Sequence, residues 1–175
     1  IKEFYENLIH IKLYDSIEIC GINFELQNIR IERSEDLSNI IRENNYRRSY
    51  FKLHFTSPTY FKAEDKVYLI PEPKMIFSGY ANNWNRLMSK EYQISQDDLN
   101  KIVESCNLVM SNLELFSFYR EEEKITGFTG ICGYRIKDCI DFDSLIKLNW
   151  LLRLSNYCGT GEDTKEGMGQ TYFGM

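Results

Sequence analysis

The sequence predicts an α+β protein whose main part, residues 47–175, is a ferredoxin-like βαββαβ domain. It is preceded over residues 1–46 by the closing helix and strand of a second ferredoxin-like half and by a linker. Polar and apolar residues alternate with the period of a strand in segments 50–56, 108–120 and 124–137. Apolar residues recur at helical spacing in segments 75–88 and 142–157. With a closing strand at 170–173, this order is that of an antiparallel sheet with its helices on one face.

The first part of the chain is predicted to end an N-terminal half. Residues 1–14 carry apolar side chains at the spacing of a helix tail, and residues 17–32 alternate as a strand or as a hairpin bent at Gly21. Residues 33–48 are polar and charged and predict a linker with one short turn. Because the chain opens at Ile1 in mid-helix, we expect it to be a piece of a longer protein.

The first strand of the main domain is predicted to have two different faces. Its alternation places Phe51, Leu53 and Phe55 on one side and Lys52, His54 and Thr56 on the other. Pro58 is expected to end the strand, because proline has no N–H to give to a sheet. The glycines of the third strand, Gly127, Gly130 and Gly133, predict bulges or the close approach of another backbone.

Composition excludes several classes of protein. The net charge of −5 and the sequence pI near 5.2 weigh against a broad, sequence-blind nucleic-acid binder. A local RNA groove built from a few cations and backbone amides remains compatible with them. The apolar runs are far shorter than the roughly 20 residues of a membrane span, and no signal peptide is visible. We therefore expect a cytoplasmic protein with no membrane partner.

The cysteines predict neither a disulfide framework nor a structural zinc site. Their number is odd and no two have the CxxC spacing. We expect small buried apolar side chains in a reducing compartment, with no metal and no cofactor. The five are Cys20, Cys106, Cys132, Cys139 and Cys158.

The glycine-rich segment 159–169 is the most informative stretch. Its pattern, G-x-G-x-x-T-x-x-G-x-G, permits positive φ angles and the close approach of another chain. Consecutive free amides in such a loop form a nest for a phosphate oxygen, where Thr164 offers a hydroxyl and Lys165 a cation. The alternative is a helix C-cap followed by a tight turn. Because the loop runs from helix to strand, it is neither the dinucleotide fingerprint nor the phosphate loop of nucleotide hydrolases.

Four segments, in order, resemble the repeat-cleaving endoribonucleases of CRISPR systems, the sixth Cas family. FKLHFTSPTYF resembles that family's TPT-x-F strand, with Pro58, Thr59 and Phe61 in place. LIPEPKMIFSGYANNWNRL resembles the start of its P-x-P-x-x-x-F…W helix, and GFTGICGYRIK its F-x-G-x-x-G strand. The last helix, the T-x-x-G-M-G loop and the closing strand look like its C-terminal signature. The resemblance spans roughly residues 50–175.

The resemblance implies a protein of two ferredoxin-like halves that binds the repeat RNA of the CRISPR precursor. It implies cleavage without a metal ion, which leaves a cyclic phosphate on the upstream product. The implied RNA-binding residues are Gly159, Gly161, Thr164, Lys165, Gly167 and Gly169, with Arg153 as a phosphate contact. For Arg153 the alternative is a solvated charge on a helix face. Glu162 and Asp163 depart from the family, which often has basic residues there, and their carboxylates are expected to repel phosphate.

The catalytic residues are not assigned by the resemblance. The family usually places a histidine general acid or base in its first half, of which residues 1–46 match only the end. Histidine titrates in the range that this chemistry needs. His10, in the predicted helix tail, and His54, on the strand face with Lys52, are the candidates, and a structural role is the alternative for each.

Two other functions stay open. One is a non-catalytic RNA-binding subunit of a CRISPR effector complex, which the acidic loop and the missing usual histidine favour. The other is a ferredoxin-like regulatory domain for small metabolites, with the loop as a turn only. Other effector-complex proteins are expected as partners, and a homodimer is left open. We expect Gly161→Val to weaken RNA binding with little loss of stability.

Overall fold

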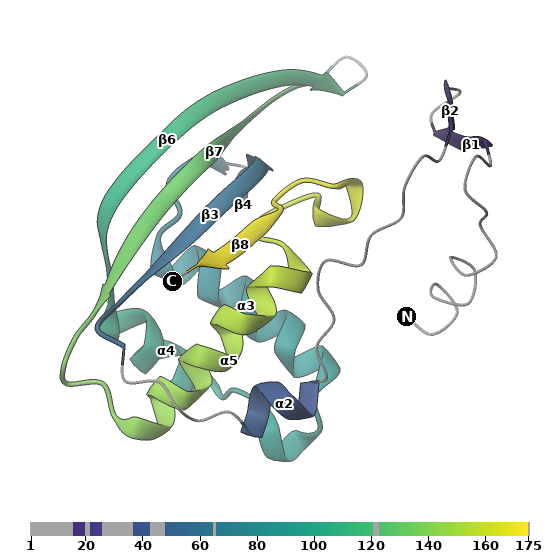
Figure 1. Ribbon diagram of the computed structural model, residues 1–175. Helices are drawn as coiled ribbons and strands as arrows, with labels where there is room; N and C mark the ends of the chain where they lie inside the picture. Colours follow the sequence, from purple (N-terminus) through teal and green to yellow (C-terminus); the bar gives the residue numbers. More distant parts are fainter. Residues whose placement is uncertain are drawn as a thin grey trace. The chain divides into compact units, whose positions relative to one another are not determined.

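The protein forms two compact units, residues 1–37 and residues 38–175. The computed structural model describes residues 16–19, 22–25, 37–42, 48–64, 66–120 and 123–174 (Figure 1). In the first unit, β1 (Ser16–Ile19) and β2 (Ile22–Glu25) pair antiparallel, so the predicted hairpin is confirmed. The predicted helix tail at residues 1–14 lies outside the described residues. That the first 46 residues close an N-terminal half stays a prediction.

The second unit is built on a four-stranded antiparallel sheet in the order β6-β7-β3-β8. Its strands are β3 (Tyr50–Thr59), β6 (Cys106–Arg120), β7 (Glu123–Ile136) and β8 (Thr171–Gly174). Within this sheet, the first strand in chain order, β3, lies between the third, β7, and the last, β8. The second, β6, lies at the edge. This is the strand order of the ferredoxin-like fold, as the sequence predicts.

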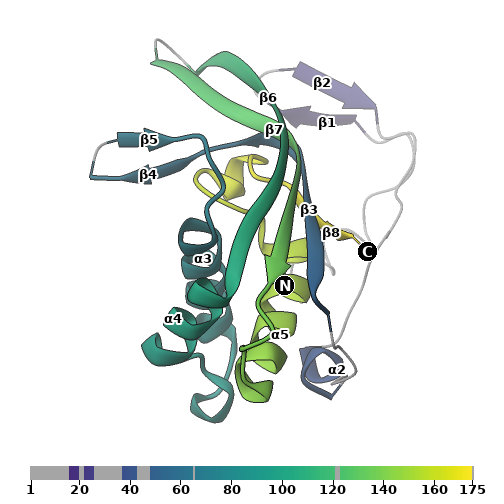
Figure 2. The same ribbon diagram turned by 90° about the vertical axis from the view of Figure 1, so that its left-hand side faces the viewer.

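The helices α3, α4 and α5 cover one face of this sheet (Figures 1 and 2). The helices of the second unit are α2 (Leu37–Arg42), α3 (Pro73–Leu87), α4 (Gln96–Ser105) and α5 (Phe142–Cys158), with single 3₁₀ turns η1 (Lys90–Tyr92) and η2 (Thr164–Glu166). None of the described helices is long and apolar enough to cross a membrane.

The short helix α2 belongs with the second unit. Ile40 is buried, and the Arg153 guanidinium of α5 donates to the Asn39 carbonyl oxygen at 3.3 Å. The compact second unit begins at Ser38. The predicted domain boundary between residues 46 and 47 stays a prediction.

The prediction that Pro58 ends its strand is wrong. β3 continues to Thr59, and its register against β7 shifts between Phe55 and Thr59. Pro58 lies in this irregular stretch, where a missing N–H breaks no regular ladder. Its carbonyl oxygen accepts a hydrogen bond from Gly169. A separate hairpin of β4 (Phe61–Ala63) and β5 (Lys66–Tyr68) follows.

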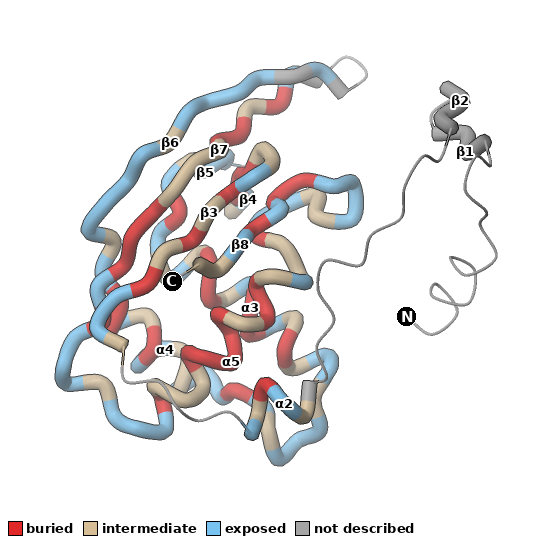
Figure 3. The backbone as a smooth tube through the Cα atoms, in the orientation of Figure 1, coloured by how far each residue is buried: buried red, intermediate tan, exposed pale blue. Residues whose placement is uncertain are grey.

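The two-faced pattern predicted for β3 is confirmed. Phe51, Leu53 and Phe55 are buried, whereas Lys52 and His54, which alternate with them, are half-buried. Figure 3 shows buried and less buried positions along β3. Each large apolar side chain buried in this way stabilises the fold by about 1.5–3 kcal/mol. Aromatic rings dominate the core, with stacked pairs Phe51–Tyr134 and Trp84–Trp150 at centroid distances of 5.0 and 5.3 Å.

The cysteine prediction is confirmed at two positions. Cys106 and Cys132 are buried, and burial raises the pKa of the Cys106 thiol to about 12, which makes it unreactive. The prediction is wrong for Cys139, which is exposed, and Cys158 is half-buried. Cys20 lies outside the described residues.

Candidate nucleic-acid interface

The glycine-rich loop 159–169 lies against the end of β3, segment 56–60 (Figure 1). Among the hydrogen bonds that join segment 56–60 to the loop and to Gln170 just after it, four measure 2.8–3.0 Å and lie between residues 56–58 and 167–170: Thr56 N–H to Gln170 O, Ser57 Oγ–H to Gly167 O, Gln170 N–H to Ser57 Oγ, and Gly169 N–H to Pro58 O. Two segments about 110 residues apart in the chain thus form one structure, which we call the loop structure. The TPT-x-F-like strand and the loop occur together in the sequence because they bind each other.

Tyr60 is the centre of this contact. Its carbonyl oxygen accepts the Glu162 N–H at 3.0 Å, and its hydroxyl donates to Asp163 Oδ2 at 2.5 Å. Of the two acids expected to repel phosphate, Glu162 is exposed, whereas Asp163 is half-buried and faces Tyr60. One of the two carboxylates is therefore held within the loop structure.

The glycines at both ends of the loop are required by the fold itself. A Cβ added to Gly161 would overlap the Tyr60 carbonyl oxygen, and one added to Gly169 would overlap the Thr160 carbonyl oxygen. Both glycines have a positive φ, 82° and 67°. At these two positions the approach of the protein's own backbone, rather than that of a ligand, excludes a side chain.

The backbone amides of the loop are largely used within the protein. Six of them donate to protein acceptors, at distances of 2.8–3.4 Å, and they belong to Thr160, Glu162, Glu166, Gly167, Met168 and Gly169. This contradicts the expectation of a loop whose amides are bare. A contact between the loop and RNA has to be made mainly by side chains and by the exposed rim.

The rim of the loop consists of Lys165, Glu166 and Gly167, all exposed. A Cβ added to Gly167 would meet open space. Thr164 is half-buried, and its methyl group lies 3.0 Å from the position of a Cβ added to Gly159. Of the predicted loop contacts, Gly161, Lys165 and Gly167 are exposed, Gly159 and Thr164 are half-buried, and Gly169 is buried.

A small apolar cluster joins the loop to two hairpins. Tyr60, Ile125 of β7 and Met168 of the loop are buried together there. Three exposed lysines each lie within three residues of a cluster member, and we call them the lysine ring: Lys62, Lys124 and Lys165. The three lysines thus belong to three separate segments that share one buried cluster, although the net charge of the chain is −5.

The far end of the β6–β7 hairpin adds exposed apolar surface next to Lys124, one member of the lysine ring. Tyr119, directly opposite Lys124 in the hairpin, is 72% exposed, and Leu115 is 63% exposed. Figures 1 and 2 show this end of the hairpin projecting beyond the helix layer. Cations next to exposed aromatic rings are the combination with which proteins hold single-stranded nucleic acid.

Neither Tyr60 nor the lysine ring stands out in the sequence. Tyr60 occupies the variable position of the TPT-x-F-like strand, and the three lysines are scattered over about 100 residues. Only in the folded protein do their three segments meet, at the cluster of Tyr60, Ile125 and Met168. The available signal is the TPT-x-F-like strand itself, since a motif at a strand end points to a contact there.

A family model described as CRISPR-associated endoribonuclease Cas6 matches residues 53–171, more than half of the chain. The chain belongs to the Cas6 family. A curated Cas6 endoribonuclease of Streptococcus thermophilus is 24% identical to it over 159 residues, which cover 91% of this chain and 63% of that protein. The chain thus spans less than two thirds of the length of this relative.

Solved Cas6 structures have a similar fold. A Cas6 product complex aligns with a TM-score of 0.82 at 18% identity, covering 99% of this chain and 72% of that chain. Thermus thermophilus Cas6 aligns with a TM-score of 0.67 at 17% identity, over 79% and 58% of the two chains. A Cas6-RT-Cas1–Cas2 complex gives 0.55 at 14% identity, over 99% and 20%. These likenesses confirm the predicted ferredoxin-like fold.

Within this Cas6 domain, the structure places Arg153 away from the loop rim. Its guanidinium donates to the Asn39 carbonyl oxygen of α2, and burial lowers the pKa of Arg153. It lies six residues before Gly159 on α5, which is about 9 Å along a helix axis. Arg153 therefore joins α5 to α2 by a hydrogen bond. Its role as a phosphate contact stays a prediction.

His54 lies on the open face of the Cas6 sheet. Its ring stands edge-on to Tyr172 of β8 at a centroid distance of 5.9 Å. It is two residues before Thr56, where β3 meets the loop structure. His10 lies outside the described residues. Among the residues that the structure describes, no three His, Cys, Asp or Glu side chains gather as a metal-binding group.

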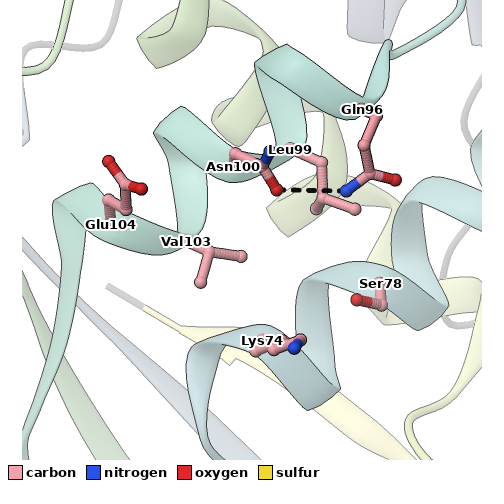
Figure 4. Close-up of a pocket in the computed structure, with 7 residues that line it drawn as sticks. All are labelled: Lys74, Ser78, Gln96, Leu99, Asn100, Val103 and Glu104. Carbon is pink, nitrogen blue, oxygen red and sulfur yellow. Dashed lines mark hydrogen bonds between the residues drawn. The ribbon is translucent and has the colours of Figure 1, made fainter.

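A hollow of about 160 Å³ on the helix layer is separate from this interface (Figure 4). α3 and α4 alone line it, with Lys74, Ser78, Gln96, Leu99, Asn100, Val103 and Glu104. Ligand pockets usually measure about 300–1,000 Å³. None of the predicted site residues lines the hollow, so its position supports no catalytic role.

Proposed function

We propose that this chain is the RNA-contacting part of a metal-independent endoribonuclease that cleaves CRISPR precursor RNA within its repeats to give guide RNAs. Membership of the Cas6 family supports this proposal. The observation that carries it is the lysine ring of Lys62, Lys124 and Lys165, three exposed lysines on the segments that share the buried cluster, with the exposed ring of Tyr119 directly opposite Lys124.

The lysine ring provides the electrostatic part of binding. Each lysine that neutralises a phosphate releases counterions, so affinity falls as salt rises. Tyr119 provides a surface on which an unpaired base stacks, at about 1–3 kcal/mol per base. The loop structure fixes both in place, because Met168 and Ile125 share one buried cluster with Tyr60. The binding surface is therefore made of side chains on a rigid support.

The cleavage chemistry needs two proton transfers. A base removes the proton of the attacking 2′-hydroxyl, and an acid protonates the leaving 5′-oxygen, each within hydrogen-bond reach. His54 is the histidine among the described residues, and it lies on the open sheet face near the loop. We keep His54 and His10 as the candidates of this chain for these roles.

Incubation with the cognate repeat RNA in EDTA tests the proposal. We expect one cut within the repeat and a cyclic phosphate at the end of the upstream product. Tight binding without cutting would support a non-catalytic RNA-binding subunit of a CRISPR effector complex, an alternative that the packing of His54 against Tyr172 favours. No binding at low salt would contradict both functions and leave the metabolite-binding domain.

The proposed partners follow from the same function. CRISPR precursor RNA is the ligand, and other proteins of a CRISPR effector complex are the protein partners. We propose a cytoplasmic location, where precursor RNA is made. Size-exclusion chromatography with light scattering, with and without RNA, decides between a monomer and a homodimer.

A further inference from the structure

Three buried hydroxyl groups meet at the neck of the loop, where residues 160 and 169 face each other. The Tyr80 hydroxyl of α3 lies 2.5 Å from Thr160 Oγ1. The Thr171 hydroxyl of β8 lies 2.6 Å from Thr160 Oγ1 and 2.8 Å from the Gly169 carbonyl oxygen. Tyr80, Thr160 and Thr171 are 1%, 2% and 7% exposed, so the chain of hydroxyls is closed to water.

The backbone contact at the neck makes the position of Thr160 decisive. The Thr160 N–H donates to the Gly169 carbonyl oxygen at 2.8 Å, the same oxygen that Thr171 contacts. A Cβ added to Gly169 would overlap the Thr160 carbonyl oxygen, so the two backbone segments at the neck are in direct contact. A shift of Thr160 therefore moves both ends of the loop, and with them its rim.

Each hydroxyl in the chain has a hydrogen-bond partner among the others, and Thr160 links the other two. Buried polar groups need partners inside the protein, and linked hydrogen bonds in a dry interior strengthen one another. Burial raises the pKa of Tyr80 above its usual value, so Tyr80 stays neutral and keeps its proton for a hydrogen bond. Removing the Thr160 hydroxyl takes one hydrogen-bond partner from both Tyr80 and Thr171, while Thr171 keeps the Gly169 carbonyl oxygen.

We infer that Thr160 is a positioning residue, through which the buried hydroxyls of Tyr80 and Thr171 fix the glycine-rich loop in the shape that presents Lys165 to RNA. α3 thereby acts on the interface, although it carries no member of the lysine ring. The consequence for RNA rests on the proposed function. The shape of the loop is measured without RNA, so the two fail separately.

Four variants of the chain test this inference. Thr160→Val keeps the shape of the side chain and removes the hydroxyl, whereas Thr160→Ser keeps the hydroxyl. Tyr80→Phe removes the first hydroxyl of the chain. Tyr134→Phe is the matched control, because the Tyr134 hydroxyl is equally buried and donates to the Pro71 carbonyl oxygen at 2.6 Å, away from the loop. The measurements are amide hydrogen exchange over residues 159–169 and the dissociation constant for single-stranded repeat RNA.

In Thr160→Val and Tyr80→Phe we expect loop exchange to accelerate and RNA binding to weaken, each by about tenfold. Thr160→Ser restores both, and Tyr134→Phe lowers the melting temperature without changing either. Equal loop exchange in Thr160→Val and Thr160→Ser overturns the inference, whatever happens to RNA. Faster exchange with unchanged RNA affinity overturns the positioning role. A wild-type chain that binds no RNA refutes the proposed function, while loop exchange still decides whether the hydroxyls fix the loop.

Discussion

The glycine-rich loop and the far end of the β6–β7 hairpin lie at the same end of the sheet, yet they are built in opposite ways. The loop uses six of its amides within the protein, and at Gly161 and Gly169 the neighbouring backbone excludes a side chain. The hairpin leaves Leu115 and Tyr119 mostly exposed. The segment with the conspicuous motif is thus the support, and the inconspicuous segment offers the free surface.

This difference separates two meanings of a glycine motif. A glycine needed because a ligand approaches should tolerate substitution in the absence of the ligand. A glycine needed because the protein's own backbone approaches should not. The following predictions test whether the loop is support and the surrounding side chains are the interface.

The largest expected effect is on folding. Gly161→Val is expected to lower the free energy of unfolding by about 3 kcal/mol, because the side chain overlaps the Tyr60 carbonyl and the positive φ is strained. This corrects the expectation of little loss of stability. Gly167→Ala, with a positive φ but open space, is the control and should lower it by about 1–2 kcal/mol. Urea unfolding measures both, and equal losses would show that the Tyr60 contact is unimportant.

The next effect is on RNA binding. Replacing the lysine ring (Lys62, Lys124 and Lys165) by alanine should weaken binding to single-stranded repeat RNA by roughly 10- to 100-fold. The slope of log affinity against log salt should fall by about 2, at about 0.7 for each phosphate contact. A fluorescence titration at several salt concentrations measures both quantities.

The control for the lysine ring is a second triple alanine variant, which removes three lysines at other exposed positions. Lys74, Lys90 and Lys101 are exposed lysines on or next to the helices. Their triple alanine variant should bind RNA like the wild type. If the two triple variants lose affinity equally, net charge rather than this surface governs binding.

A smaller effect is expected at the hairpin. Tyr119→Ser should weaken RNA binding by about tenfold through the loss of one stacked base, with an unchanged salt slope. Tyr119→Phe should bind normally, because it keeps the ring. Tyr157→Ser, at an exposed position of α5, is the control. A normal affinity for Tyr119→Ser would remove the hairpin from the interface.

The smallest effect is expected in the helix layer, where a substitution should change the free energy of unfolding but not RNA binding. Lys147 Nζ of α5 donates to Asp98 Oδ1 of α4 at 2.8 Å, and the Asp98 side chain is only 14% exposed. Burial alone would raise the pKa of Asp98, but hydrogen bonds from Lys147 and Ser95 outweigh it and lower the pKa below 3.8. Asp98→Asn should lower the free energy of unfolding by about 1–2 kcal/mol at pH 7, with unchanged RNA affinity.

The contribution of Asp98 to stability should decrease as the pH falls. Because the pKa of Asp98 is lower in the folded than in the unfolded chain, its stabilisation is complete above the unfolded value of about 3.8. It is lost as the pH falls through the folded pKa. The stability difference between wild type and Asp98→Asn should therefore be constant from pH 7 to pH 5 and shrink towards pH 2. A difference that grows on acidification would contradict the pair.

The sheet, its helices and their order follow from patterns within single segments. Alternation predicts the faces of β3, and helical spacing predicts α3 and α5, because local periodicity reports which side meets the core. The end of β3 does not follow, since whether a strand tolerates Pro58 depends on its partners. Here the register shift against β7 and the Gly169 amide accommodate it.

The candidate site follows from the sequence only in part. The glycine pattern marks the loop, and Lys165 is exposed at its rim. The pattern cannot show that the Glu162 and Gly169 amides are used internally, because their acceptors, the Tyr60 and Pro58 carbonyl oxygens, lie about 100 residues away in the chain. Arg153 illustrates the same limit, since its acceptor, Asn39, is 114 residues away.

The hydrogen bonds between the end of β3 and the loop can form only after both segments have been synthesised. The bond from Ser57 to Gly167 spans 110 residues of sequence. During synthesis the ribosome adds about 5–20 residues per second, so Tyr60 waits several seconds or more for its partners. The contact between the end of β3 and the loop therefore forms only after translation has passed the loop.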